Sequence, residues 1–250
     1  MQSSNNTEEN RRVESLEAQL ESLTEELEAF AFSVSHDLRA PVRQIGSFAE
    51  LIAGRSADAL DDKSTLYLQN IISSTERMSQ LIDDLLAYSR VAKSAVKNIQ
   101  FRLSELINEI IQEDLILESR GRKIQWNIKD LGEINGDPIL LRQVFTNLMS
   151  NSIKFTRPVK NPEISIGRII EPGENIIFIR DNGVGFNNKY AEKVFDVFYR
   201  LHQQDEFEGS GIGLAIVKRI VSICGGIVWA EGKENSGASF FMKLPDNSQI

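Results

Sequence analysis

Apolar residues recur at alternating intervals of three and four residues along the first part of the chain. They are Val13, Leu16, Leu20, Leu23, Leu27, Phe30 and Val34. This heptad spacing predicts a coiled-coil helix, whose narrow apolar stripe must be covered by a partner helix. The same segment of a second copy of the chain can supply that partner, so the spacing predicts a parallel homodimer.

The apolar stripe continues beyond Val34 with wider spacing. Its further members are Leu38, Val42, Ile45, Ala49 and Ile52. Glycine, serine and aspartate residues at 54–64 then favour a turn, and a second helical stripe follows. That stripe comprises Leu68, Ile71, Thr75, Met78, Ile82 and Leu85. The pattern predicts a helical hairpin, and two hairpins in a homodimer would form a four-helix bundle.

Past residue 98 the sequence alternates between helical and strand patterns. Asp137 and Pro138 have the residue types of a helix start. Helices are predicted at 104–115, 137–155, 190–200 and 211–224. Strands are predicted at 123–128, 163–170, 175–180, 226–231 and 238–244, with a turn at 171–173. Helices that cover one face of a sheet form an α/β sandwich.

The predicted elements divide the chain into three parts. We expect a coiled-coil helix at 1–30, a helical hairpin at 31–93 and an α/β sandwich domain at 98–250. The domain boundary should fall near residues 92–98. In a dimer, the coiled coil would lead directly into the four-helix bundle.

Composition limits the class of protein. The chain has 250 residues, 41% of them hydrophobic, and a net charge of -8, which argues against binding to nucleic acid. Cys224 is the single cysteine, so an internal disulfide is impossible and a reducing, cytoplasmic compartment is expected. No apolar run approaches the roughly 20 residues that cross a bilayer. We expect a soluble piece of a longer protein whose sensor domain lies outside this chain, and a membrane anchor in that parent protein stays open.

His36 lies in the segment FSVSHDLRAP. It is two residues from both Val34 and Leu38, which is about 200° around a helix, so its side chain should point away from the apolar stripe. An imidazole is mostly an uncharged nucleophile at neutral pH. Asp37 can fix the ring tautomer through a hydrogen bond, and Pro41 removes one helical hydrogen bond nearby. An exposed histidine without a role fits the same residues.

Asn147, Asn151 and Lys154 recur at helical spacing in the segment NLMSNSIKF. One face of the predicted helix therefore carries two amide oxygens and an ammonium group. Amide oxygens are hard ligands that suit Mg²⁺, and a lysine suits phosphate. A polar helix face turned to solvent is the alternative.

The segment RDNGVGF directly follows the strand predicted at 175–180. Gly183 and Gly185 permit a ligand to approach the backbone closely, and Asp181 can accept a hydrogen bond from an exocyclic amine such as that of adenine. A plain glycine turn in a hairpin is the alternative.

The segment EGSGIGL places Gly209, Gly211 and Gly213 just before a predicted helix. Backbone N–H groups at such a helix start form an anion site, although the spacing matches neither the Walker loop nor the dinucleotide fingerprint. A glycine-rich loop without a ligand is the alternative. The preceding segment FYRLHQQDEFEG is predicted to be a lid in which Arg200 can reach a phosphate and His202 faces solvent.

Taken together and in this order, these segments resemble the conserved boxes of sensor histidine kinases, and the lid resembles the phytochrome-like branch most closely. FSVSHDLRAP is similar to the phospho-acceptor box, NLMSNSIKF to the asparagine box, RDNGVGF and EGSGIGL to two glycine boxes, and VFDVFYR to the aromatic box. The resemblance implies a dimerisation and phosphotransfer hairpin followed by a gyrase-like ATP-binding domain. It further implies autophosphorylation of His36 by ATP and transfer of the phosphoryl group to an aspartate of a response-regulator receiver domain.

The resemblance also implies roles for single residues. Asp37 would activate His36, and Pro41 would help the helix to bend. Asn151 would ligate the Mg²⁺ that bridges the ATP phosphates, with Asn147 and Lys154 steadying the same cluster. The implied nucleotide-binding residues also include Phe155, Asp181, Gly183, Gly185, Arg200, Gly209, Gly211, Gly213 and Leu214.

Two other functions remain as alternatives. A degenerate scaffold would bind nucleotide and partners without transferring phosphate. An ATPase similar to gyrase would need an acidic residue four positions before Asn151, where this chain has Asn147. Ala40 stands where regulator-dephosphorylating members of the resembled family carry Thr or Asn, so strong kinase and weak phosphatase activity is expected.

Overall fold

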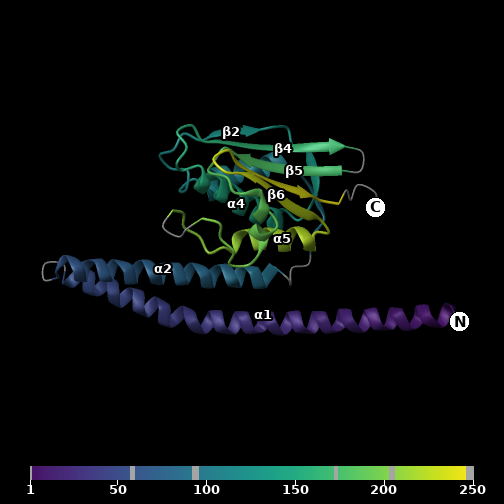
Figure 1. The fold of residues 1–250 in the computed structure, drawn as a ribbon, viewed down its shortest axis with the longest axis horizontal. Helices are drawn as coiled ribbons and strands as arrows, with labels where there is room; N and C mark the ends of the chain where they lie inside the picture. The colour runs from purple at the N-terminus through teal and green to yellow at the C-terminus, as the bar shows by residue number, and fades with distance from the viewer. Residues whose placement is uncertain (1, 57–59, 92–95, 172–173, 203–205, 246–250) are drawn as a thin grey trace. The chain divides into compact units, whose positions relative to one another are not determined.

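The computed structural model describes residues 2–56, 60–91, 96–171, 174–202 and 206–245. The chain forms two compact units that divide between Arg90 and Val91. The first is helical, and the second contains helices and β-strands (Figure 1). The boundary expected at 92–98, the turn expected at 171–173 and the middle of the expected lid lie partly outside the described residues.

The first unit is a hairpin of helices α1 (Gln2–Arg55) and α2 (Asp62–Val91). The Asp61 carboxylate accepts a hydrogen bond from the Ser64 N–H at 2.8 Å, which satisfies one of the free donors at the start of α2. The predicted helical hairpin is confirmed.

Small and apolar side chains join the two helices. Val42 of α1 forms one buried cluster with Ile82 and Leu86 of α2. Gly46 permits a close approach, because a Cβ atom at this position would lie 2.9 Å from Thr75 Oγ1. The hairpin is therefore held by close packing along one face of each helix.

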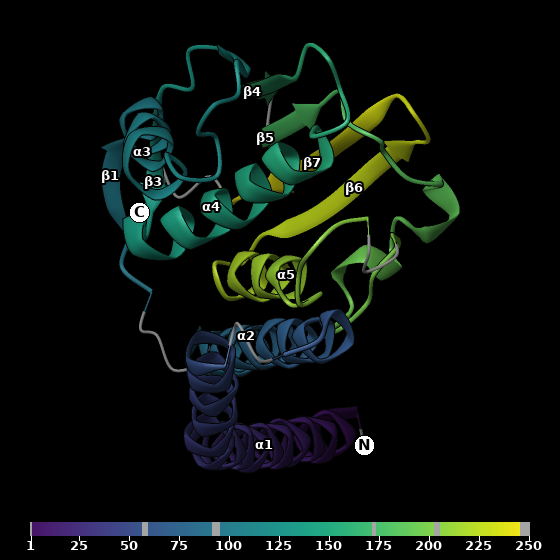
Figure 2. The ribbon, with the colours of Figure 1, turned by 90° about the vertical axis from the view of Figure 1, so that its left-hand side faces the viewer.

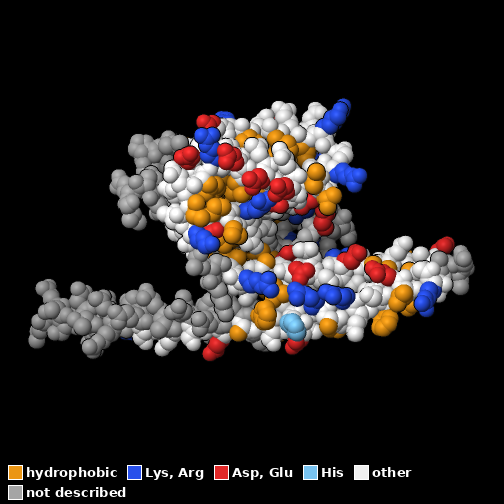
Figure 3. Space-filling model, turned by 180° about the vertical axis from the view of Figure 1, so that it is seen from behind, with side chains coloured by type: hydrophobic (Ala, Val, Ile, Leu, Met, Phe, Trp, Pro, Cys, Tyr) orange, Lys and Arg blue, Asp and Glu red, His pale blue; other side chains and the backbone are white. Residues whose placement is uncertain are grey.

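A second apolar stripe on the hairpin is exposed. Leu38, Ile45 and Ile52 follow one another at seven-residue intervals along α1, and each is 47–49% exposed. Apolar side chains are visible between charged ones along the helical rod in Figure 3. The described residues thus retain an uncovered apolar face. The side chains that define most of the predicted heptad lie outside the described residues: Val13, Leu20, Leu23, Leu27 and Phe30.

The second unit is built on a five-stranded sheet with the order β2-β4-β5-β7-β6. Its strands are β2 (Gln125–Ile128), β4 (Glu163–Glu171), β5 (Glu174–Asp181), β6 (Ile227–Lys233) and β7 (Gly237–Lys243). β2 and β4 are parallel, and the other neighbours are antiparallel. Each strand falls within a segment predicted from alternation or differs from it by a few residues.

Helices α4 (Pro138–Phe155) and α5 (Gly213–Ile223) cover one face of this sheet (Figure 2). Phe145 and Leu148 of α4, and Val217 of α5, are fully buried. So are Ile177 and Ile179 of β5, which share a face because side chains alternate along a strand. The predicted α/β sandwich is confirmed.

The start of the second unit contains elements that the sequence pattern did not indicate. Strands β1 (Ile99–Arg102) and β3 (Glu133–Gly136) pair in a separate antiparallel sheet. The helix predicted at 104–115 is instead α3 (Leu103–Glu109) followed by a π-helical turn, η1 (Ile110–Asp114).

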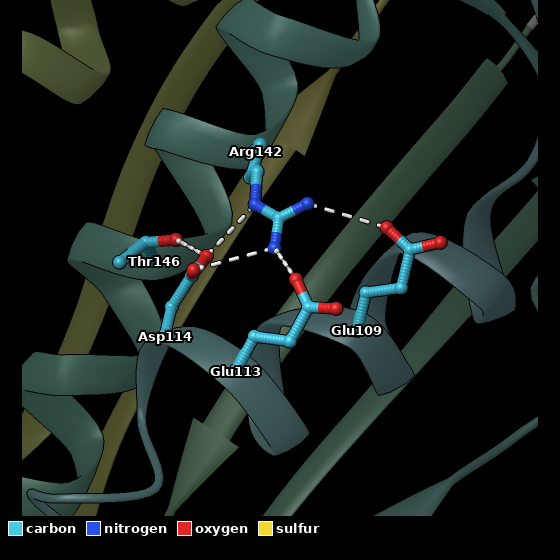
Figure 4. Close-up of polar contacts among 5 residues, drawn as sticks. All are labelled: Glu109, Glu113, Asp114, Arg142 and Thr146. Carbon is cyan, nitrogen blue, oxygen red and sulfur yellow. Dashed lines mark hydrogen bonds and ion pairs between the residues drawn. The ribbon is translucent and has the colours of Figure 1, made fainter.

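Arg142 of α4 joins that helix to α3 and η1 (Figure 4). Its guanidinium donates to Asp114 at 2.9 Å, to Glu113 at 2.7 Å and to Glu109 at 3.2 Å. Hydrogen bonds to Asp114 and Glu113 raise the pKa of Arg142. Thr146, one turn further along α4, donates to Asp114 at 3.3 Å. These contacts set the rotation of α4 about its axis.

The helix predicted at 190–200 is wrong. The segment forms two short 3₁₀ turns, η2 (Asn188–Tyr190) and η3 (Lys193–Phe195), and then an irregular stretch. Phe198 adopts a left-handed backbone with a φ of 63°, and its N–H donates to the carbonyl of Gly211 at 3.0 Å. This tertiary hydrogen bond replaces the helical one, because a left-handed residue cannot continue a right-handed helix.

A helix that spans a bilayer must be both long and apolar. Within the described part of the chain, none of the helices meets both conditions.

Candidate functional site

His36 is an exposed side chain of α1, as its spacing predicts, with 73% of its surface accessible. Its Nδ1 lies 3.2 Å from Asp37 Oδ1. Because a carboxylate can only accept, Nδ1 carries the proton, and in the neutral ring the lone pair is on Nε2. Pro41 lies inside α1 without interrupting it, and Figures 1 and 2 show that α1 is bent.

The asparagines lie on α4, whose start is fixed by Asp137. Its Oδ1 accepts from the N–H groups of Ile139 at 2.9 Å and Leu140 at 3.2 Å, so the predicted helix start is confirmed. Asn147 and Asn151 are half-buried beside the fully buried core face of the helix. They share one side of α4, as their spacing of four predicts.

The glycine-rich segment before α5 approaches this face of α4. A Cβ atom on Gly213 would lie 2.9 Å from Asn147 Oδ1, and one on Gly209 would lie 3.2 Å from Lys154 Nζ. Lys154 Nζ also donates to Asn151 Oδ1 at 3.1 Å. Segments about 55 to 66 residues apart in the sequence therefore meet, and glycine lets them approach closely.

Lys154 is partly withdrawn from solvent. Burial lowers the pKa of its ammonium group to about 8, and the nearby Glu208 carboxylate opposes this change. Its Nζ lies 4.4 Å from the centre of the Phe155 ring, within the range of a cation–π contact. A lysine in this setting gains most from an anionic ligand, because such a ligand restores the lost solvation of its charge.

Asp181 ends β5 and is only 4% exposed. Its Oδ1 accepts from the N–H of Gly183 at 2.9 Å, and its Oδ2 accepts from Ser152 Oγ at 3.4 Å. Burial nevertheless raises the pKa of Asp181 to about 6. Gly183 is required here, since a Cβ atom would lie 2.6 Å from the carbonyl oxygen of Phe155.

The remaining predicted residues lie around these groups. Gly185 and Gly211 have positive φ values of 61° and 77°, which explains why glycine occupies both positions. Arg200 donates to the carbonyls of Phe207 at 2.6 Å and Gly209 at 2.7 Å. Leu214 is half-buried near the start of α5.

His202 does not face solvent, contrary to expectation. It is half-buried, and its Nε2 lies 3.1 Å from the carbonyl oxygen of Gly185. Its ring packs 5.3 Å from the centres of both Phe155 and Phe207. His202 and Phe207 of the expected lid therefore pack against the end of α4.

Several site residues carry no local sequence pattern. Ser152 hydrogen-bonds Asp181 from 29 residues away, and Arg157 pairs with Glu208 from 51 residues away. Only the tertiary fold brings such residues together. An alternating or helical period cannot indicate them.

Within the described ranges, no group of three or more His, Cys, Asp or Glu side chains could hold a metal ion. The amide oxygen of Asn151 fits a magnesium ion whose other ligands come from phosphates and water.

The fold and site define the class of protein. An exposed histidine on a helical hairpin is followed by an α/β domain in which asparagine and lysine side chains of α4 meet a glycine-rich segment. A family model for the "His Kinase A (phospho-acceptor) domain" matches residues 26–94. A model for "Histidine kinase-, DNA gyrase B-, and HSP90-like ATPase" matches residues 136–248. The chain belongs to the sensor histidine kinases.

Curated relatives agree with this membership. Cyanobacterial phytochrome A from Nostoc sp. is 34% identical over 90% of this chain and 29% of its own length. The methanogenesis regulatory histidine kinase FilI from Methanothrix harundinacea is 35% identical over 91% of this chain and 25% of its length. Sensor protein kinase WalK from Staphylococcus haemolyticus is 30% identical over 86% of this chain and 36% of its own length. The chain thus spans about a third or less of these relatives.

Solved structures share the fold. Full-length ShkA in complex with AMPPNP matches 87% of this chain and 45% of its own, with a TM-score of 0.62 and 24% identity. The Acinetobacter baumannii histidine kinase AdeS matches 85% of this chain and 98% of its own, with a TM-score of 0.59 and 18% identity.

Proposed function

We propose that this chain binds ATP with Mg²⁺, transfers the γ-phosphoryl group to His36, and passes it to an aspartate of a response-regulator receiver domain. The observation that supports this most strongly is the presence in one chain of an exposed His36–Asp37 pair and a glycine-lined site on α4. The degenerate scaffold is disfavoured because the residues of both parts are in place.

The proposed binding mode follows from the donor and acceptor groups. Asp181 accepts from the exocyclic amine of adenine, and Phe155 flanks the base. Asn151, with Asn147 beside it, holds Mg²⁺ against the phosphates, and Lys154 contacts the same oxygens. Bound Mg²⁺ neutralises part of the phosphate charge. Arg200 and the N–H groups of residues 209–213 complete the phosphate site.

The chemical step requires a nucleophile and little else. His36 Nε2 forms the bond to the γ-phosphorus, and the bond to the bridging oxygen breaks, so that ADP leaves with the electron pair. Asp37 stabilises the positive charge on the imidazole through Nδ1–H. Phosphoryl transfer has a loose transition state, so positioning and charge neutralisation supply most of the catalysis.

The proposed assembly is a homodimer through the hairpin. The exposed stripe of Leu38, Ile45 and Ile52 has the seven-residue spacing that a second copy can cover. We also propose a cytoplasmic location, where ATP and the regulator are available.

Ala40, exposed four residues after His36, cannot position a water molecule, so weak phosphatase activity is expected and Ala40→Thr should increase it.

Incubation of the chain with labelled ATP and Mg²⁺ tests the proposal. We expect label that is stable in base, lost in acid, and absent from His36→Gln and Asn151→Ala. A scaffold would take up no label, and an ATPase would release labelled phosphate without modification. Label that survives His36→Gln would overturn the assignment of His36.

A further inference from the structure

Positive charge gathers at the C-terminal end of α4. Lys154 lies in the last turn of the helix, and Arg157 lies two residues beyond the helix end. Arg200 approaches the same region from the segment before α5. After burial, the charges of Arg200 and Arg157 lower the pKa of Lys154, whereas Glu208 raises it. Three cations therefore lie close enough to interact around Glu208, and the Glu118 carboxylate also acts on Lys154 and Arg157.

Arg157 and Glu208 form a two-pronged ion pair. Nη1 and Nη2 of Arg157 each donate to a different carboxylate oxygen of Glu208. This fork is also the geometry by which a guanidinium binds a phosphate group. The two side chains are 44% and 63% exposed, and exposed ion pairs contribute little to stability. Replacement of Glu208 by another anion on the Arg157 guanidinium therefore costs little free energy.

Glu208 lies directly beside the groups proposed to hold phosphates. Its neighbour Gly209 approaches Lys154 Nζ so closely that a Cβ atom would lie 3.2 Å from it. The carbonyl of Gly209 accepts from Arg200 at 2.7 Å. Among the described residues, Glu208 is thus the carboxylate that pairs with Arg157 in a cluster with excess positive charge, next to the place where polyphosphate is expected.

We propose that Arg157 is a further phosphate-binding residue, and that Glu208 occupies its guanidinium until the phosphates of a nucleotide replace it. The inference rests on the proposed function and names a part of the same site. The ligand chemistry is a polyphosphate chain, so ATP and ADP should exchange with Glu208 and adenosine should not. Glu208 acts as an internal competitor of the nucleotide.

The two partners therefore have effects of opposite sign on nucleotide affinity. Arg157→Ala removes a charge-assisted contact and should raise the Kd for Mg²⁺–ATP about tenfold. Glu208→Gln removes the competitor and should lower that Kd about threefold. An ion pair that only held the segment in place would give a weaker affinity with either change.

Isothermal titration of the full chain with ATP in Mg²⁺ measures these effects. Lys160→Ala is the control for Arg157→Ala, because it removes a positive charge from a nearby exposed side chain. Glu206→Gln is the control for Glu208→Gln, because it removes a negative charge in the same way. Both controls should leave the Kd within about twofold of the wild type. Arg157→Lys keeps the charge without the fork and should lie between the wild type and Arg157→Ala. Affinity for adenosine should be equal in all variants, and thermal unfolding confirms that each is folded.

Effects of the same sign from Arg157→Ala and Glu208→Gln would overturn the inference, as would an equal gain from Glu206→Gln. If the wild type binds no ATP in the presence of Mg²⁺, the proposed function fails and this inference with it. Normal ATP binding with effects of the same sign removes only the role of Arg157 and Glu208.

Discussion

Asp181 is a carboxylate kept in a place where burial disfavours its charge. Hydrogen bonds from Gly183, Ala238 and Ser152 lower its pKa, but burial is the larger effect and raises the pKa to about 6. A neutral side chain would be more stable there. A carboxylate has a use in a nucleotide site, because it accepts a hydrogen bond from the amine of adenine.

Asp181→Asn should separate stability from binding. The folded chain keeps the Asp181 proton up to a pH of about 6, whereas the unfolded chain loses it near 3.8. The unfolded chain therefore binds fewer protons between these values, and this group makes the free energy of unfolding fall by about 3 kcal/mol as the pH rises through them. The variant should lack this fall and should not bind ATP at pH 7. Urea unfolding from pH 4 to 7 measures the difference, and identical pH profiles would contradict it.

At the scale of elements, Arg142 contributes three ion pairs to the contact of α4 with α3 and η1. Arg142→Ala leaves Glu109, Glu113 and Asp114 facing one another without a cation, and should lower the free energy of unfolding by about 1–2 kcal/mol. The loss should shrink in high salt, which screens the repulsion.

Arg102→Ala is the control for this change. Arg102 pairs with Glu133 at 3.8 Å and is 66% exposed, so its removal should be nearly neutral. Denaturant unfolding of both variants gives the comparison. Equal stabilities for Arg142→Ala and Arg102→Ala would rule out the role assigned to the Arg142 cluster.

Close packing of α1 against α2 can be tested with two glycines of α1. Gly46→Leu should destabilise the hairpin by about 2 kcal/mol, because even its Cβ atom would contact the buried Thr75 side chain. A Cβ atom on Gly54 would have no non-adjacent neighbour within 4 Å among the described residues, so Gly54→Leu should be neutral or stabilising. Thermal unfolding measures both. Similar melting temperatures for the two variants would contradict the packing.

Long periodic elements were predictable, and short or irregular ones were not. The helices on either side of 54–64 and the strands of the main sheet follow from residue spacing alone. β1 and β3 have four residues each, too few to show a period. The segment 190–200 has a helical pattern, but the left-handed Phe198 and its bond to Gly211 override it.

For the whole molecule, the exposed stripe on α1 predicts a dimer. Ile45→Glu should give a monomer, because it places a charge in the proposed interface, and autophosphorylation should fall with dimerisation. Ile227, at the start of β6, is also an exposed isoleucine, and the Ile227→Glu variant should remain dimeric. Light scattering coupled to size exclusion distinguishes these results. A wild-type chain that is monomeric at micromolar concentration would refute the prediction.

The candidate site was predictable where its residues lie in short motifs. His36, the α4 asparagines, Asp181 and the glycines each stand in a segment that resembles a conserved box of sensor histidine kinases, and their roles as ligands stay predictions. Arg157, Glu208 and the packing of His202 depend on contacts between distant segments, and no local period marks them. Short motifs thus predict the ligands of the site. The proposed competition between Glu208 and phosphate for Arg157 can be inferred only from the fold.

The sharpest test of the nucleotide site is an equilibrium titration of the full chain with ATP, with and without Mg²⁺, for the wild type and Asn151→Ala. We expect the wild type to bind ATP more tightly when Mg²⁺ is present, and Asn151→Ala to lose that enhancement while keeping the fold. Absence of ATP binding, or an affinity that neither Mg²⁺ nor Asn151→Ala changes, would contradict the site described for α4.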